Sequence, residues 1–153
     1  MPLARTLIPL LLVTTLLMPA GSRAEPSVGL VLPDRQAVHT QTSDFMARVA
    51  SNQVEAAYQQ LRPFLGVASE PFDQSAREAD AYFQMVTGQV GQPLASVHLH
   101  SDGIGEHFYR ETWLQKFNTA AIAWTLTFYR PHDDWKLVGV SYSTDLDALY
   151  QPQ

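Results

Sequence analysis

The spacing of apolar residues changes at Pro93, and this change constrains the fold more than any other feature of the chain. Before Pro93 the apolar residues recur every three or four positions, which predicts amphipathic helices. After Pro93 they alternate with polar residues, which predicts strands that each bury one face. Because the two kinds of element occupy separate parts of the sequence, we predict an α+β fold in which N-terminal helices pack on a curved antiparallel sheet.

Three helices are expected before Pro93. Asp34 is a suitable N-cap for the first helix, whose apolar positions run from Val38 to Ala50. The second helix is expected over Val54–Leu61, where a following proline stops it. The third is expected from about Phe72 to Thr87, before a pair of glycines that can end a helix.

Four strands are expected after Pro93, followed by a short helical turn near the C-terminus. The predicted strands are Ala95–His100, Glu106–Phe117, Ala120–Arg130 and Trp135–Ser143. A two-residue turn between the second and third strands would place Trp113 opposite Trp124, and Tyr109 opposite Phe128.

The turn between the third and fourth strands, Pro131 to Asp134, sets a second register. The pairs that it predicts are Phe128 with Val138, Leu126 with Val140, and Trp124 with Tyr142. Both turns bring the apolar side chains to one face of the sheet, which we call the inner face and expect the helices to cover. Its predicted members are Tyr109, Trp113, Phe117, Ile122, Trp124, Leu126, Phe128, Val138, Val140 and Tyr142.

The N-terminus has the pattern of a secretory signal peptide. A short basic head, an apolar run and a small-residue end occupy residues 1–24, and we expect cleavage after Ala24. Residues 25–33 are expected to form a leader segment, and residues 34–153 a single domain. We therefore expect an exported protein, periplasmic or secreted, with no membrane attachment after cleavage.

Composition narrows the class of partner and the means of stabilisation. The chain carries 15 acidic and 10 basic residues, a net charge of −5 with neutral histidines, which argues against a nucleic-acid partner. It has no cysteine, so no disulfide holds the fold and packing must do so alone. No cofactor is expected.

Two segments carry a resemblance to a known superfold. The turn "YRPHDDWKL", Tyr129 to Leu137, and the segment "VEAAYQQLRPFL", Val54 to Leu65, resemble the nuclear-transport-factor-2-like superfold, also called the cystatin-like α+β cone. The resemblance extends back to about Gln36 and is greatest to exported bacterial members of unknown function. It implies a cone-shaped fold. Members include ketosteroid isomerases and polyketide cyclases, whose cone holds a carboxylate base and Tyr or acid donors, and many members without activity.

Glu111 is the acid that strand alternation turns toward the inner face, between Tyr109 and Trp113. A buried carboxylate needs compensation, from water at a pocket mouth, from protonation, or from a helix arginine. The candidate arginines are Arg48, Arg62 and Arg77, and we predict an ion pair with Arg48 or Arg77.

The same strand face supplies the candidates for catalysis and for ligand binding. Glu111, as a general base, together with His107 and Tyr109 would give three polar groups along one side of the strand. The candidate pocket-lining residues are Tyr109, Glu111, Trp113, Trp124, Leu126, Phe128 and Tyr142.

Three of the five histidines lie close together in "VHLHSDGIGEHFYR". If Val97 and Leu99 face the core, His98 and His100 point outward from an edge strand and away from His107. This is the expected arrangement, and it predicts no metal site. A one-residue slip of the strand would instead bring the three histidines together as metal ligands.

These features predict an exported, non-catalytic binding or accessory domain for a small apolar ligand or a partner protein. The first alternative is a small-molecule isomerase, lyase or cyclase that uses Glu111 as its base. The second is a metal-binding protein that uses His98, His100 and His107. The opposite face of the sheet is rich in threonine and alanine, and we predict a homodimer through it.

Overall fold

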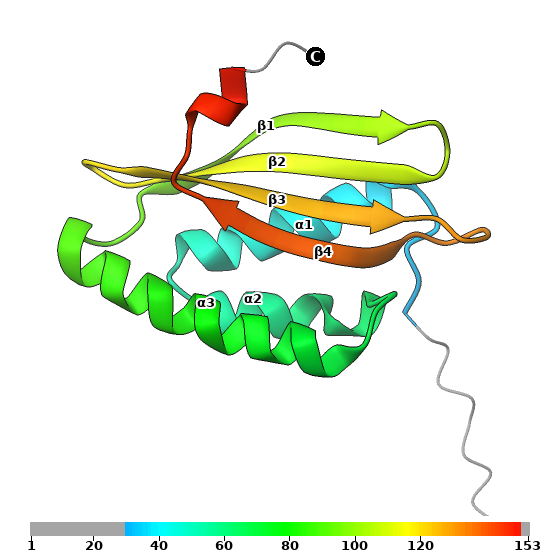
Figure 1. Ribbon diagram of the computed structural model, residues 1–153, viewed down its shortest axis with the longest axis horizontal. Helices are drawn as coiled ribbons and strands as arrows, with labels where there is room; N and C mark the ends of the chain where they lie inside the picture. The colour runs from blue at the N-terminus through cyan, green and yellow to red at the C-terminus, as the bar shows by residue number, and fades with distance from the viewer. Residues whose placement is uncertain (1–29, 151–153) are drawn as a thin grey trace, which may run out of the picture.

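The structure is a computed structural model that describes residues 30–150. The predicted signal peptide, residues 1–24, lies outside the described residues, as does most of the leader segment. Three α-helices precede a sheet of four antiparallel strands in the order β1-β2-β3-β4 (Figure 1). The predicted α+β architecture, with helices packed on a curved antiparallel sheet, is confirmed. Among the described residues, no helix is long and apolar enough to cross a membrane.

The helices are α1 (Arg35–Ala50), α2 (Val54–Leu61) and α3 (Ser69–Val90), with a 3-10 turn η1 (Arg62–Phe64) between α2 and α3. Asp34 caps α1 as predicted, because its carboxylate accepts a hydrogen bond from the Ala37 N–H at 2.7 Å. Helix α3 is longer at both ends than the sequence indicated. Pro71 lies in its first turn, where proline is tolerated, and the helix ends at Gly91, whose φ of 86° favours glycine.

The strands are β1 (Ala95–Ile104), β2 (Phe108–Lys116), β3 (Ala121–Tyr129) and β4 (Lys136–Ser143), followed by the 3-10 turn η2 (Asp147–Tyr150). Leu32 lies beside Trp135, which donates a backbone hydrogen bond to the Leu32 carbonyl at 2.8 Å. Both side chains are buried, so the residues just before α1 contribute to the core.

The β2–β3 register is the predicted one, with Trp113 opposite Trp124 and Tyr109 opposite Phe128. The β3–β4 register is as predicted for Leu126 with Val140 and for Trp124 with Tyr142. The prediction that Phe128 pairs with Val138 was wrong. An irregularity between Thr127 and Phe128 shifts the pairing, so Phe128 lies opposite Leu137, which is fully buried while Val138 is only half-buried.

The prediction that Val97 and Leu99 face the core was also wrong. The residues "SDGI" extend strand β1 to Ile104, so Val97 lies opposite Leu114 and Gly103 opposite Tyr109. Val97 and Leu99 are 42% and 40% exposed, on the side of the sheet away from the helices. The error arose because a polar, glycine-containing segment was expected to form a loop and instead continues the strand.

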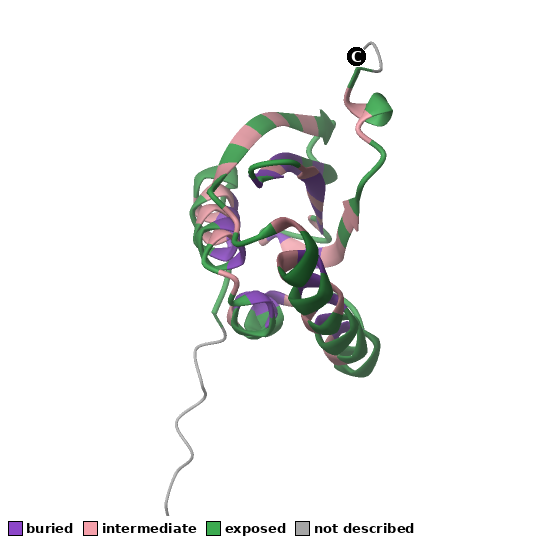
Figure 2. Ribbon diagram, turned by 90° about the vertical axis from the view of Figure 1, so that its left-hand side faces the viewer, coloured by how far each residue is buried: buried purple, intermediate pink, exposed green. Residues whose placement is uncertain are grey.

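The inner face packs against the helices, and the buried residues lie between these two layers (Figure 2). The Trp124 indole lies at the centre with no exposed surface, stacked on the Phe83 ring at a centroid distance of 5.0 Å. The rings of Phe45 and Tyr142 contact it from other sides. These aromatic side chains therefore fill the centre of the fold.

Candidate functional site

Glu111 is fully buried on the inner face of β2, as strand alternation predicted. The two neighbours of like orientation on the same strand both donate hydrogen bonds to it. The Tyr109 hydroxyl donates to Oε1 at 3.0 Å, and the Trp113 indole N–H donates to Oε2 at 3.0 Å. The period of two along a strand places these groups side by side.

Helix α1 supplies the other partners of this carboxylate. The Thr42 hydroxyl donates a short hydrogen bond to Glu111 Oε2, and His39 Nδ1 lies 3.0 Å from Oε1. His39 and Thr42 are three residues apart and so share one side of the helix. Glu111 thus has polar partners at both oxygens, two from its own strand and two from α1.

The predicted ion pair of Glu111 with Arg48 or Arg77 was wrong. Arg48 donates to the Gln60 side chain and Arg77 to the Gln74 side chain, while Arg62 pairs with Asp73. All three arginines are exposed on the surface. The nitrogenous partner that the structure gives Glu111 is the His39 imidazole, with Nδ1 at 3.0 Å from Oε1.

His98 completes a group of three ligating side chains. Its ring lies 5.2 Å from the His39 ring and 4.9 Å from the Trp113 ring, measured between centroids. One ligand atom from each of His39, His98 and Glu111 can be chosen so that all lie within 4.8 Å of one another. His98 Nε2 is also 3.0 Å from Ser101 Oγ on the same strand.

The prediction that His98 and His100 both point outward was wrong for His98, and the alternative that brings both together with His107 was wrong as well. A bulge between His98 and His100 turns these side chains to opposite faces of the sheet. His100 lies 3.5 Å from the Asp102 carboxylate, on the outer face. His107 lies in the exposed β1–β2 turn, where its backbone N–H donates to the Ile104 carbonyl.

Sequence reasoning missed His39, although a signal for it was present. His39 precedes Thr42 by three residues and Met46 by seven, and both of these are fully buried. That spacing places His39 on the buried side of α1. What the helix pattern alone could not supply is the strand residue that faces it.

The remaining pocket-lining candidates lie in the packed core. Trp124, Leu126 and Phe128 have no exposed surface, and Trp113 is 6% exposed. Tyr142 is half-buried against the rings of Tyr82, Phe83 and Trp124.

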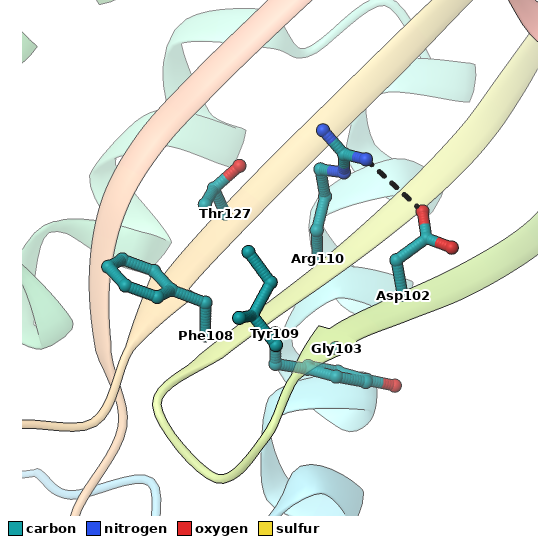
Figure 3. A pocket seen from close by; sticks show the side chains of 7 residues that line it. Asp102, Gly103, Phe108, Tyr109, Arg110 and Thr127 are labelled. Atoms are coloured by element: carbon teal, nitrogen blue, oxygen red, sulfur yellow. Dashed lines mark hydrogen bonds and ion pairs between the residues drawn. The ribbon is translucent and has the colours of Figure 1, made fainter. Parts of the chain in front are cut away.

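Tyr109 contacts Glu111 and also borders a cavity on the surface. Burial raises the pKa of the Tyr109 phenol, and the neighbouring Glu111 carboxylate raises it further. Tyr109 also borders a small surface cavity of about 140 Å³ at the end of the β1–β2 hairpin (Figure 3). Around this cavity Arg110 pairs with Asp102 at 3.3 Å, beside Phe108 and Thr127.

No protein-family model, curated protein or solved structure matches the chain.

Proposed function

We propose that the chain is an exported, non-catalytic binding domain of the nuclear-transport-factor-2-like superfold, periplasmic or secreted. Helices that precede an antiparallel meander, and a sheet that curves around them, support this fold assignment. The signal-peptide pattern of residues 1–24 supports export.

The geometry around Glu111 gives the isomerase, lyase or cyclase alternative no support. A general base must come within about 2.6–3.2 Å of the proton that it removes. Glu111 is fully buried and both of its oxygens already accept hydrogen bonds. The stacked Trp124 and Phe83 rings occupy the interior where such a substrate would lie.

The outer face of the sheet, turned away from the helices, carries the proposal. At the end of the β1–β2 hairpin it exposes Ile104, Phe108 and Tyr129, which are 71%, 40% and 38% exposed. The cavity beside them, about 140 Å³, is smaller than the roughly 300–1,000 Å³ of sites for drug-sized ligands. A protein surface fits this shallow apolar region better than a small ligand does.

We take the occupant of this face to be a second copy of the chain. Thr125, Thr127 and Ser141 give this face small uncharged side chains on adjacent strands β3 and β4, and Arg110 of β2 lies opposite Thr127. Arg110 on β2 pairs with Asp102 on the edge strand β1, so a two-fold axis could set the arginine of one copy against the aspartate of the other. Small side chains suit sheet-on-sheet packing on the part of this face beside η2, whose Ala148 and Leu149 border Thr125 and Ser141.

Sedimentation velocity of the wild type and Thr125→Arg tests this proposal. We expect the wild type to sediment as a dimer and Thr125→Arg as a monomer, because the new charge would be buried between the sheets. Thr40→Arg is the matched control, since Thr40 is exposed on α1, and it should remain dimeric. A wild type that is monomeric at high concentration would refute the dimer.

A further inference from the structure

We propose that His39, His98 and Glu111 bind one divalent transition-metal ion, of which zinc is the simplest example. The three residues come from α1, β1 and β2, and they present one ligand atom each within 4.8 Å of one another. Two imidazoles and a carboxylate form a ligand set that suits zinc and other first-row divalent ions. The site lies between helix and sheet, so it is independent of the outer face.

The distance between the ligand atoms of His39 and Glu111 is close to that around a bound ion. Zinc bonds to histidine nitrogen and carboxylate oxygen are about 2.0–2.1 Å, so neighbouring ligand atoms of a tetrahedral site are about 3.3 Å apart. His39 Nδ1 and Glu111 Oε1 are 3.0 Å apart. An ion can therefore replace the hydrogen bond between them after a small separation of the two atoms. A ligand atom of the His98 ring lies within 4.8 Å of the ligand atoms of both other residues.

The bulge in β1 is the backbone feature that aims His98 at this site. Without it, regular alternation would keep His98 and His100 on the same face. With it, His98 turns toward Trp113 and α1 while His100 stays outside. Val97 and Leu99 are exposed on β1. The strand therefore turns His98 toward the helices, although these two aliphatic side chains would be the usual residues to bury. Bulges of this kind often redirect a side chain next to a functional site.

The surroundings of Glu111 fit a metal-ligating carboxylate. Tyr109, Trp113 and Thr42 hold its two oxygens by hydrogen bonds, which fixes the orientation of the carboxylate. Among the ion pairs of residues 30–150, Glu111 has no lysine or arginine partner. A cation at this position would supply the positive charge that a fully buried carboxylate needs.

Access to the site differs for an ion and for a larger molecule. The His39 side chain is 38% exposed and His98 is half-buried, so an ion can enter between α1 and β1. Glu111 has no exposed surface, and the His39 imidazole beside it is partly open to solvent. Three protein ligands leave a fourth position for water on the solvent side, as in open zinc sites.

Isothermal titration calorimetry of the purified, chelator-treated protein with zinc chloride at neutral pH tests this site. We expect one zinc ion per chain. His39→Ala and His98→Ala should each weaken binding by more than the roughly 10–100-fold that loss of an outer-shell partner costs. His100→Ala is the matched control, because His100 lies on the same strand but on the opposite face, and it should bind zinc like the wild type.

Thermal melting gives a second readout, because a bound ion stabilises the folded state. Zinc should raise the melting temperature of the wild type, of His100→Ala and of the monomeric Thr125→Arg, but not of His39→Ala or His98→Ala. Both ligand histidines are partly exposed, so these variants should fold. Absence of heat with the wild type, or equal zinc affinity in the wild type and the His39→Ala/His98→Ala double variant, would overturn the proposal. Thr125→Arg tests the metal site independently of the dimer, because zinc should stabilise this variant whether or not the wild type dimerises.

Discussion

Glu111 and Gln115 lie four residues apart on the inner face of β2, and their hydrogen-bond partners differ in kind. Both are fully buried, and each accepts a hydrogen bond from a tryptophan indole. Gln115 accepts from Trp124 at 2.9 Å and donates to the Val49 carbonyl at 3.3 Å, so its amide is matched at both ends. Its surroundings are those of a structural core residue.

Glu111 has a different kind of neighbourhood at the other end of the strand. Three of its contacts come from neutral donors, and the fourth comes from His39, which is partly open to solvent. A second imidazole, that of His98, stands next to His39 without contributing to the hydrogen bonds of the carboxylate. Burial alone therefore does not identify a functional site. The excess of ligating groups beyond what hydrogen bonding requires distinguishes the Glu111 end from the Gln115 end.

Gln115→Glu should have the largest effect on stability. The new carboxylate could still accept from the Trp124 indole, but an oxygen would face the Val49 carbonyl where the amide now donates. An uncompensated buried charge costs about 3–5 kcal/mol of unfolding free energy. Urea denaturation at neutral pH measures this loss of unfolding free energy. A loss smaller than that of Glu111→Gln would contradict the distinction drawn between the two residues.

Glu111→Gln should have a smaller effect. Glutamine offers one acceptor oxygen and an amide that donates, so it can satisfy only part of the group formed by His39, Thr42, Tyr109 and Trp113. We expect a loss of about 1–3 kcal/mol in the free energy of unfolding. The same urea series measures it. Superimposable curves for the wild type and this variant would mean that Glu111 is in contact with water.

The parts of the fold that could be predicted are those fixed by local sequence. The β2–β3 register followed from a short turn between two strands whose aromatic residues agree in spacing, so Trp113 was correctly placed opposite Trp124. The orientation predicted for β1 was wrong because the strand continues through Gly103, and because a bulge after His98 breaks the alternation on which the prediction depended. A bulge arises from pairing with a neighbouring strand, and the period of two does not reveal it.

The candidate site divides in the same way. Alternation alone placed Glu111 on the inner face beside Tyr109 and Trp113. Its partners on α1 could not be identified, because which side of a helix meets which residue of a sheet depends on tertiary packing. The prediction of an arginine rested on charge, whereas His39 and Thr42 were the polar side chains within reach.

The effect of Glu111 on the ionisation of Tyr109 should be the smallest of the three predicted effects. Burial raises the pKa of Tyr109 at the Glu111 end, and burial also raises the pKa of Tyr58, whose ring lies 6.5 Å from that of Trp124 at the other end. A phenol with a raised folded-state pKa stabilises the fold fully below its unfolded value of about 10. That contribution is lost as the pH rises through the folded-state pKa.

Only Tyr109 of these two has Glu111 as a neighbour that raises its pKa further. Glu111→Gln should therefore shift the ionisation of Tyr109 toward lower pH and leave that of Tyr58 unchanged, because it removes a negative charge beside one phenol alone. The phenolate absorbance measured during an alkaline titration reports all six tyrosines of the chain, so the shift is measured as the difference between the curves of the variant and the wild type. In a Tyr109→Phe background the same substitution should leave the titration curve unaltered. A Glu111→Gln curve identical to that of the wild type would show that the carboxylate does not act on this phenol, and the hydrogen bond between them would lose its support.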